Sequence, residues 1–574
     1  MIKRLYGYMK QYNKYLILSC LCVIGETVFE LVIPLLMADI IDIGVANGDK
    51  QYIITQGIIM VICAFIALVL GVMYARYAAT AGQGFGANIR KEEFEKVQNF
   101  SFKNTDHFST SSLITRLTSD VTIIQNAVCN GVRPIVRAPF MLLTALILTF
   151  TINAKLAFVF IVAIPILGLG LFFIVRKVGP LYRLMQSSID QVNTVVQENL
   201  NAIRVVKSYV RGTYEEEKFD KINEKLKQNS EHAFRTSVLN LPLFQYVMYG
   251  TIVCIILFGG QMIFSGDMQV GELTGFLSYV LQILNALMMI SNVFLMLTRS
   301  IASGERIVEV LDEIPDIVSP EPCINEVKNG DVDFKHVYFK YKDEAKEYVL
   351  SDIDIHIPSG STVGILGGTG SAKTSMVQLI PRLYDVNNGQ VLVGGVDVKK
   401  YSVEQLRDAV GMVLQKNTLF SGTIKDNLLW GDKEASDEDL EWACQQACVN
   451  EFLQNFPDGY LTDLGQGGVN ISGGQKQRLC IARALLKHPK VLILDDSTSA
   501  VDTATEAHIK EALSNLKDTT KIIIAQRVSS IQHADQIIIL DEGKIHAIGN
   551  HEELLENDPI YQEIYYSQLE GAGL

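Results

Sequence analysis

The sequence lacks the surplus of basic residues that a nucleic-acid-binding protein requires. It contains 50 Lys and Arg against 63 Asp and Glu, which gives a formal net charge of −13. Proteins that wrap DNA or RNA need a concentrated basic surface to neutralise the phosphates. A nucleic-acid partner is therefore not expected.

The nine cysteines lack the spacing of a metal site. Cys20 and Cys22 lie in an apolar run, and Cys444 and Cys448 are one helical turn apart, without a second pair or a nearby histidine in the sequence. Ordinary reduced, buried thiols account for this pattern. A small-residue cleavage site at signal-peptide spacing is also lacking, so the first residues are not expected to be a removed targeting segment.

Long apolar runs are abundant in the first half. Hydrophobic residues make up 48% of the chain, and the mean hydropathy is +0.21. Runs long enough to cross about 30 Å of hydrocarbon begin near Leu16, Ile53, Ile135, Leu156, Phe244 and Leu273. This pattern predicts six membrane spans, with a tight turn at "TINAK" between the third and the fourth.

Positive charge indicates the orientation of these spans. The N-terminal segment and residues 83–133 and 176–235 carry most of the Lys and Arg, whereas "IGVANGDK" and "FSGDMQVGE" carry almost none. The basic segments and both termini are therefore expected in the cytoplasm. The two long basic segments show helical periodicity, which predicts that the membrane helices continue as cytoplasmic stalks. The opening "MIKRLYGYMKQYNKY" is typical of an amphipathic helix at the membrane surface.

Two acidic residues fall inside the first span. Glu26 and Glu30 share a helix face, and ionisable groups at membrane depth are costly. Two interpretations remain open: a site for a cationic or polar substrate, or protonated carboxyl groups hydrogen-bonded between helices. In the last span, the side chains of Met288, Met289, Phe294 and Met296 could line an adaptable apolar cavity or pack between helices.

The second half alternates β-branched runs with helical patterns, as α/β domains do. We predict an α-helical polytopic membrane domain over residues 1–311, a linker over 312–329, and an α/β P-loop nucleotide-binding cassette over 330–574. The run "STVGILGGTGSAKTSMVQLI" consists of a strand, a Gly-rich turn and a helix start, which is the context that a phosphate-binding loop requires.

The residues of this loop suit the binding of a phosphate group and Mg²⁺. Backbone N–H groups from Gly368 to Thr374 can face a phosphate, Lys373 adds a positive charge, and the Thr374 hydroxyl can bind Mg²⁺. The loop departs from G-x-x-x-x-G-K-[ST] at Ala372. Because alanine tolerates a helical φ, ATP binding is expected to survive. The predicted nucleotide-binding residues of the loop are Gly367, Gly368, Thr369, Gly370, Ser371, Ala372, Lys373 and Thr374.

Further motifs follow at defined distances. They are Gln415 in "VGMVLQKNTLFSGTI", the run "ISGGQKQR", Asp495 in "VLILDDSTSAVD", the turn from Ser499 to Asp502, and Gln526 in "IIIAQRVSSI". At these residues the chain resembles the ATP-binding cassette (ABC) family, for which "SGGQ" shortly upstream of such a strand is highly specific. With the six spans and the stalks, essentially the whole chain resembles a half-transporter of the ABC exporter type.

The resemblance implies ATP and Mg²⁺ as cofactors and a role for each matching residue. Tyr341 matches the aromatic residue that stacks on adenine. Gln415 matches the residue that links Mg²⁺ to the membrane domain, and Asp495 matches the second Mg²⁺ carboxylate. Asp502, at the end of the turn that begins at Ser499, is a further predicted catalytic residue. The signature residues, which close over ATP held by an opposite cassette and so require a dimer, are Ser472, Gly473, Gly474 and Gln475.

Two catalytic positions deviate from the pattern of active members. Asp496 replaces the Glu that polarises water, and Gln526 replaces the switch His. Aspartate is shorter by one methylene, and a displacement of about 1 Å can cost on the order of 10²-fold in rate. Glutamine cannot carry a charge or shuttle a proton. Gln466 also replaces a family Glu near the signature.

These deviations favour a degenerate site that holds ATP, in a heterodimer with a second half-transporter whose own ATP site is consensus. The chain then resembles the degenerate-site subunit of a bacterial multidrug-type exporter in the plasma membrane. Such an ATP-driven translocase moves small hydrophobic or amphipathic compounds outward by alternating access, through short helices expected around residues 107–112 and 209–216. The alternatives are a dedicated lipid or peptide exporter and, from another class, a membrane-bound nucleotide sensor.

Overall fold

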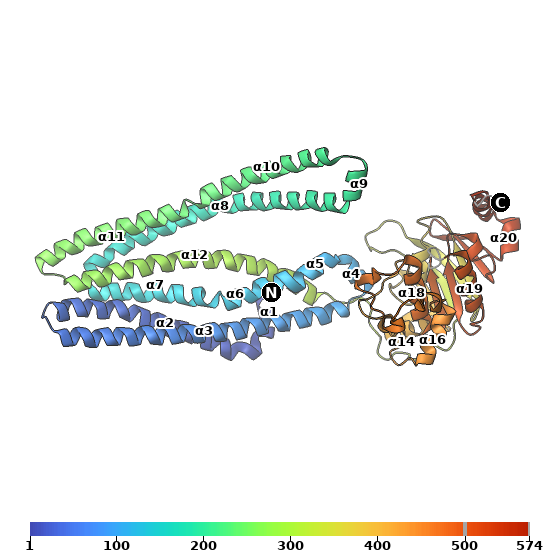
Figure 1. The fold of residues 1–574 in the computed structure, drawn as a ribbon, viewed down its shortest axis with the longest axis horizontal. Helices are drawn as coiled ribbons and strands as arrows, with labels where there is room; N and C mark the ends of the chain where they lie inside the picture. Colours follow the sequence, from blue (N-terminus) through green and yellow to red (C-terminus); the bar gives the residue numbers. More distant parts are fainter. Residues whose placement is uncertain (497–501, 572–574) are drawn as a thin grey trace. The chain divides into compact units, whose positions relative to one another are not determined.

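The structure, a computed structural model, describes residues 1–496 and 502–571 and falls into two units (Figure 1). The first unit comprises residues 1–98 and 110–313, and the second comprises residues 99–109 and 314–574. Residues 99–109, which lie in the sequence between helices of the first unit, therefore group with the second.

The first unit is helical throughout its described elements. Six of its helical segments are long and apolar enough to cross a membrane, which confirms the prediction of a six-span domain. The bounds are α1 Ile2–Met9, α2 Asn13–Asp39, α3 Lys50–Gln98, α5 Thr110–Thr115, α6 Val121–Cys129, α7 Val132–Ile152, α8 Ala154–Asn201, α9 Ile203–Ser208, α10 Gly212–Ser237, α11 Asn240–Ser265 and α12 Val270–Asp312.

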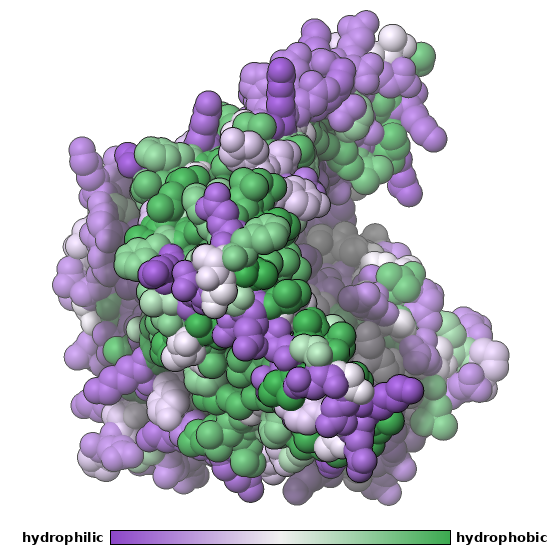
Figure 2. All heavy atoms as spheres, turned by 90° about the vertical axis from the view of Figure 1, so that its left-hand side faces the viewer, coloured by the Kyte–Doolittle hydropathy of each residue, from purple (hydrophilic) through white to green (hydrophobic). Residues whose placement is uncertain are grey.

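Apolar side chains on these helices point outward as well as inward. Ile54, Phe65 and Leu68 of α3 and Phe158 and Phe173 of α8 are all exposed. Figure 2 shows hydrophobic residues gathered at the end of the unit where α2 meets α3 and α11 meets α12. Exposed apolar helix faces are the surface that a lipid environment solvates.

The predicted N-terminal helix is present as α1. Its buried residues Leu5 and Met9 lie in one cluster with Phe85 and Ile89 of α3 and Ile307 of α12. The apolar face of α1 therefore packs on the other helices of its unit. The predicted turn at "TINAK" is also present, since the Asn153 side chain accepts a hydrogen bond from the first turn of α8.

The two short helices between the stalks begin earlier than predicted. Helix α4 (Phe102–His107) starts after Ser101, because the Ser101 and Asn104 side chains each bond the other's backbone N–H in a capping box. Helix α9 (Ile203–Ser208) ends before residue 209, and α10 begins at Gly212. The predictions around residues 107–112 and 209–216 were therefore wrong by about one turn or more.

The second unit contains two sheets and the remaining helices. A four-stranded sheet has the order β2-β1-β4-β5, and a six-stranded sheet has the order β10-β9-β3-β8-β7-β6. The strands are β1 Val332–Phe339, β2 Leu350–Ile357, β3 Thr362–Leu366, β4 Asn388–Val393, β5 Val396–Asp397, β6 Val410–Val413, β7 Val491–Asp495, β8 Thr520–Ile524, β9 Gln536–Asp541 and β10 Lys544–Gly549. The helices are α13 Lys373–Gln378, α14 Val403–Ala409, α15 Ile424–Leu428, α16 Asp437–Gln446, α17 Asn450–Leu453, α18 Gly473–Leu485, α19 Thr503–Ser514, α20 His551–Asn557 and α21 Pro559–Gly571.

The parallel strands of the larger sheet place the motifs at one edge. β8 pairs in parallel with both β3 and β7, with Ile365 and Asp495 each opposite Ile524. The carboxyl ends of neighbouring parallel strands meet at the same edge, where α/β sheets bind ligands. The loop after β3, the residues after β7 and those after β8 are therefore adjacent. This is the predicted α/β P-loop architecture.

Candidate functional site

A cavity of about 570 Å³ opens at this edge and unites four of the predicted motifs. Its lining includes Gly367, Gly368, Thr369, Gly370, Ser371, Ala372, Lys373, Thr374, Gln415, Asp495, Asp496, Gln526 and Ile564. The signature residues Ser472 to Gln475 are not among the described residues that line it. The cavity thus contains one half of the predicted machinery.

The loop lysine is folded onto its own loop. Lys373 Nζ donates to the carbonyl oxygens of Gly367 and Gly368, both at 2.8 Å, and to Ser371 Oγ at 3.2 Å. Burial lowers the pKa of Lys373, while the charges of Asp495 and Asp496 oppose that shift. A phosphate group that entered the cavity would offer charged oxygens in place of these neutral acceptors.

Ala372 does not have the helical φ that the sequence reasoning assumed. Its backbone lies at φ 70° and ψ 22°, in the left-handed region, directly before α13. The prediction of a helical φ at Ala372 was therefore wrong. A left-handed conformation costs a residue with a Cβ atom roughly 1–2 kcal/mol, a cost that glycine avoids. The loop adopts its fold in spite of this strain.

Oxygen donors suited to Mg²⁺ lie beside the lysine. Thr374 Oγ1 donates to Asp495 Oδ1 at 3.1 Å. Burial raises the pKa of Asp495, and the neighbouring Asp496 charge adds to the effect. A hydroxyl and a buried carboxylate, with the Gln415 amide on the same cavity wall, fit the hard-oxygen preference of Mg²⁺. Bound there with ATP, Mg²⁺ would neutralise phosphate charge.

The two deviant residues contact each other. Gln526 Nε2 donates to Asp496 Oδ2 at 2.8 Å, and the Gln415 side chain also hydrogen-bonds to this carboxyl group. Burial raises the pKa of Asp496. Neutral amide donors thus engage the carboxylate oxygens with which a general base would accept a proton from water.

Tyr341 lies next to the start of the loop helix. Its hydroxyl group is 2.8 Å from Ser375 Oγ, and its ring meets those of Phe339 and Tyr384 edge to face. Burial raises the pKa of Tyr341, so the hydroxyl stays protonated at neutral pH. The half-exposed ring is thus fixed beside α13, and Tyr341 is not among the described residues that line the cavity.

The signature forms the N-terminus of α18. Ser472 is the N-cap, and its side chain and that of Gln475 form a capping box. Gly473 has open space around the position of a Cβ atom. Asp502 caps α19 through the Thr505 backbone N–H. The remainder of the predicted turn, including Ser499, lies outside the described residues.

In the first unit, Glu26 and Glu30 of α2 are paired with two arginines of α7. Arg133 contacts Glu26, and Arg137 contacts both carboxyl groups. These four residues, the charge network, contain equal numbers of acidic and basic groups. Neither arginine was predicted as a partner of the glutamates, although the two arginines share the spacing of four residues.

The methionines of the last span pack against other helices. Met288 packs against the large core cluster that includes Phe160 and Phe276, and Met289 packs against a small cluster formed by Ala138 and Met141 of α7 and Ala286 of α12. Both side chains therefore contribute to interhelical packing in this conformation. The side chain of Phe294 lies outside the described residues.

The side chain of Gln568 holds the backbone after β8 through two hydrogen bonds, a contact that was not predicted from the sequence. Gln568 of α21 donates to the Gln526 carbonyl oxygen at 2.8 Å and accepts from the Val528 N–H at 2.9 Å. One amide side chain thus bonds the backbone on both sides of Arg527. A lone glutamine in a C-terminal helix carries no sequence signal for such a contact.

Comparisons with known proteins match this geometry. The family model described as ABC transporter transmembrane region matches residues 16–287, and the model described as ABC transporter matches residues 350–499. The ABC transporter ATP-binding protein YfiB of Bacillus subtilis, itself uncharacterized, is 39% identical over 99% of this chain and 98% of its own. YgaD of the same organism, whose name assigns it provisionally to multidrug export, is 32% identical over 99% of both chains.

A solved structure shares the fold. The ATP-bound structure of a bacterial Atm1-family ABC exporter superposes with a TM-score of 0.81, at 23% identity, over 98% of this chain and 99% of that one. The family matches cover most of the helical unit and, in the cavity, the Gly-rich loop, Gln415 and Asp495. The chain therefore belongs to the ABC transporter family, as a multi-pass membrane protein whose fused ATP-binding cassette couples ATP hydrolysis to transport.

Proposed function

We propose that this chain is the degenerate-site subunit of a heterodimeric exporter for small hydrophobic or amphipathic compounds. The contact between Gln526 and Asp496, at 2.8 Å, carries the proposal. It joins the two positions at which active members of the family carry a base and a histidine. Two neutral amides on one short carboxylate favour retention of ATP over its hydrolysis.

The partner supplies what the cavity lacks. The partner's signature closes over ATP and Mg²⁺ held by Lys373, Thr374 and Asp495, while Ser472 to Gln475 close over the partner's ATP. Hydrolysis proceeds in the partner's site. The ATP held in this chain biases the cassettes toward contact through binding energy alone. Both termini lie in the cytoplasm of a bacterial cell.

The substrate class rests on the helical unit. The paired charges of the charge network leave no net charge to select an ionic substrate. The name of YgaD supports the same class. A dedicated lipid or peptide exporter would use the same apolar helices, and only that substrate class would then stimulate ATP hydrolysis.

The test is steady-state ATP hydrolysis by the purified chain, alone and with a co-purified partner half-transporter. We expect the lone chain to bind ATP with little turnover, the pair to be active, and the double variant Asp496→Glu, Gln526→His to gain turnover alone. A Lys373→Ala change in the double variant controls for contaminating hydrolases. Transporter-like turnover by the lone wild-type chain would refute the degenerate site, and an active pair that moves no substrate into vesicles would favour the nucleotide sensor.

A further inference from the structure

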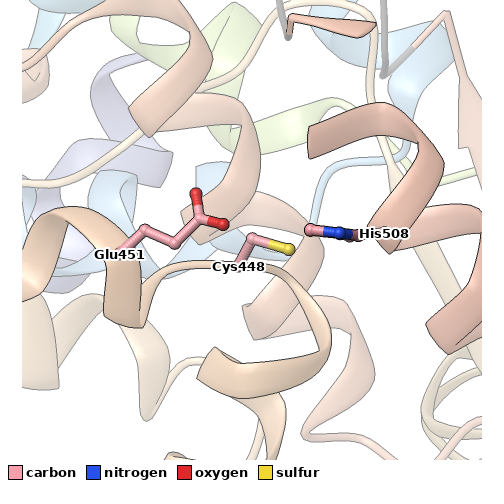
Figure 3. Close-up of side chains that lie close together, drawn as sticks. All are labelled: Cys448, Glu451 and His508. Atoms are coloured by element: carbon pink, nitrogen blue, oxygen red, sulfur yellow. The ribbon is translucent and has the colours of Figure 1, made fainter. Parts of the chain in front are cut away.

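Three side chains that commonly bind metals converge in the second unit, within the helices that flank α18. Donor atoms of Cys448, Glu451 and His508 all lie within 4.8 Å of one another (Figure 3). Cys448 and Glu451 come from the turn before α17 and from α17 itself, and His508 comes from α19. Sixty residues separate the cysteine from the histidine, so only the fold reveals the cluster.

The turn at Cys448 has an unusual backbone. Cys448 lies at φ 54°, in the left-handed region, and is buried with 9% exposure. Such a conformation costs a non-glycine residue on the order of 1–3 kcal/mol. The turn brings the thiol and the carboxylate, which are spaced as C-x-x-E, to the same side of the chain. Figure 3 shows the thiol directed toward His508.

Arg478 of α18 fixes both parts of this segment. Its Nη1 donates to Glu451 Oε2 at 2.8 Å and to the Cys448 carbonyl oxygen at 2.9 Å. An outer residue that bonds a carboxylate orients the remaining oxygen, as partners behind metal ligands commonly do. The guanidinium charge also opposes a cation, so affinity below that of a closed four-ligand site is expected.

We propose that Cys448, Glu451 and His508 bind a zinc-class divalent ion. Sulfur, imidazole nitrogen and carboxylate oxygen form a donor set that suits Zn²⁺ and Co²⁺, whereas Mg²⁺ prefers oxygen donors alone. Three protein ligands leave a fourth position for water. Binding releases the thiol proton to solvent as the thiolate bonds the metal. Exposed Glu451 and His508 give the ion access from solvent.

The bound ion would link two helices that carry different motifs. Helix α17 is held to signature helix α18 by Arg478, and α19 begins next to its N-cap, Asp502. A metal bridge between α17 and α19 would tie the signature side of the cassette to α19. The site is thus placed to restrain the movement of one relative to the other.

Co²⁺ binding to the full chain in detergent, after removal of metal by a chelator, tests this site. We expect one Co²⁺ per chain with thiolate-to-metal charge-transfer absorption, displaced by Zn²⁺. Cys448→Ser should abolish the absorption, and His508→Ala should weaken binding at least about tenfold. Cys323→Ser and His533→Ala, in other parts of the second unit, should leave the absorption and the Co²⁺ affinity unchanged.

Glu451→Gln is the variant that separates loss of metal binding from misfolding, because glutamine has the same shape as glutamate. Its thermal unfolding in chelator should stay close to that of the wild type, because glutamine can still accept the hydrogen bond from Arg478 and an exposed ion pair contributes at most about 1 kcal/mol, while its Co²⁺ affinity falls. Absorption that persists in Cys448→Ser, or wild-type binding no stronger than that of the three ligand variants, would overturn the proposal.

Discussion

At the scale of the residue, Ala372 carries a side-chain methyl group at a position whose left-handed backbone conformation favours glycine. Its φ of 70° carries strain of roughly 1–2 kcal/mol, whereas glycine would lose about 0.4–1 kcal/mol through greater freedom of the unfolded chain. We therefore expect Ala372→Gly to raise the free energy of unfolding of the cassette by about 0.5–1 kcal/mol.

Denaturant unfolding followed by tryptophan fluorescence measures this change selectively. Both tryptophans, Trp430 and Trp442, lie in the cassette, so the helical unit contributes no signal of this kind. Ala507→Gly is the matched control, because Ala507 is exposed in the interior of α19 and glycine should cost about 0.5–1 kcal/mol there. If both substitutions change the free energy of unfolding by the same amount, the backbone of Ala372 is not strained.

The charge network is a second residue-level feature with a measurable energy. The Glu26 side chain is 5% exposed, and Glu26→Gln would leave Arg133 without its charge partner, whereas Arg137 would keep Glu30. Removing one partner of a buried ion pair costs about 3–5 kcal/mol, whereas removing both costs far less. We expect Glu26→Gln to lower thermal stability in detergent strongly, and Arg133→Gln to recover part of the loss in the double variant.

The exposed pair Lys91 and Glu95 of α3 is the control for this cycle. The two side chains are 77% and 58% exposed and lie 3.8 Å apart. Their coupling should not exceed about 0.5 kcal/mol. If the coupling energy between Glu26 and Arg133 is no larger than that between Lys91 and Glu95, the network does not couple α2 to α7.

At the scale of the element, α21 acts on the residues after β8 through Gln568. In the background of Asp496→Glu and Gln526→His, we expect Gln568→Ala to reduce the gained ATP turnover, by up to about 10²-fold if the loop shifts by 1 Å. Gln562→Ala is the control, since Gln562 lies on the same helix and its side chain donates to the Leu555 and Glu556 carbonyl groups of α20. Similar turnover in both variants would leave Gln568 without a positioning role.

Elements whose signal is contiguous could be predicted from the sequence. The strand ending at Asp495, the loop before α13 and the six apolar segments all appear in the structure, because each depends on local periodicity and turn chemistry. The start of α4 was missed because its capping box uses Asn104 in place of Glu or Gln. The partners of Glu26 and Cys448 were missed because they come from distant helices.

At the scale of the whole molecule, the proposed heterodimer makes the two cassette motifs of this chain unequal. Ser472 serves the partner's hydrolytic site, whereas Lys373 serves a site that holds ATP. We therefore expect Ser472→Ala to reduce ATP hydrolysis by the assembled pair far more than Lys373→Ala does. The rate of phosphate release from the co-purified pair measures both.

Loss of the helix cap must be separated from loss of the signature. Ser436→Ala provides this control, because Ser436 caps α16 with the same capping-box geometry but lies outside the motif. Each cap is worth about 1 kcal/mol of stability. Equal losses of hydrolysis in Ser472→Ala and Lys373→Ala would instead indicate two equivalent sites, as in a homodimer.

The neutrality of the charge network bears on the response to membrane voltage. Moving one elementary charge across the membrane changes the free energy by about 2.3 kcal/mol per 100 mV. Two carboxylates and two guanidinium groups that move together contribute opposite terms, which cancel. The helices that carry them can therefore change position without electrical work, and transport of an uncharged compound should proceed at the same rate in polarised and depolarised vesicles.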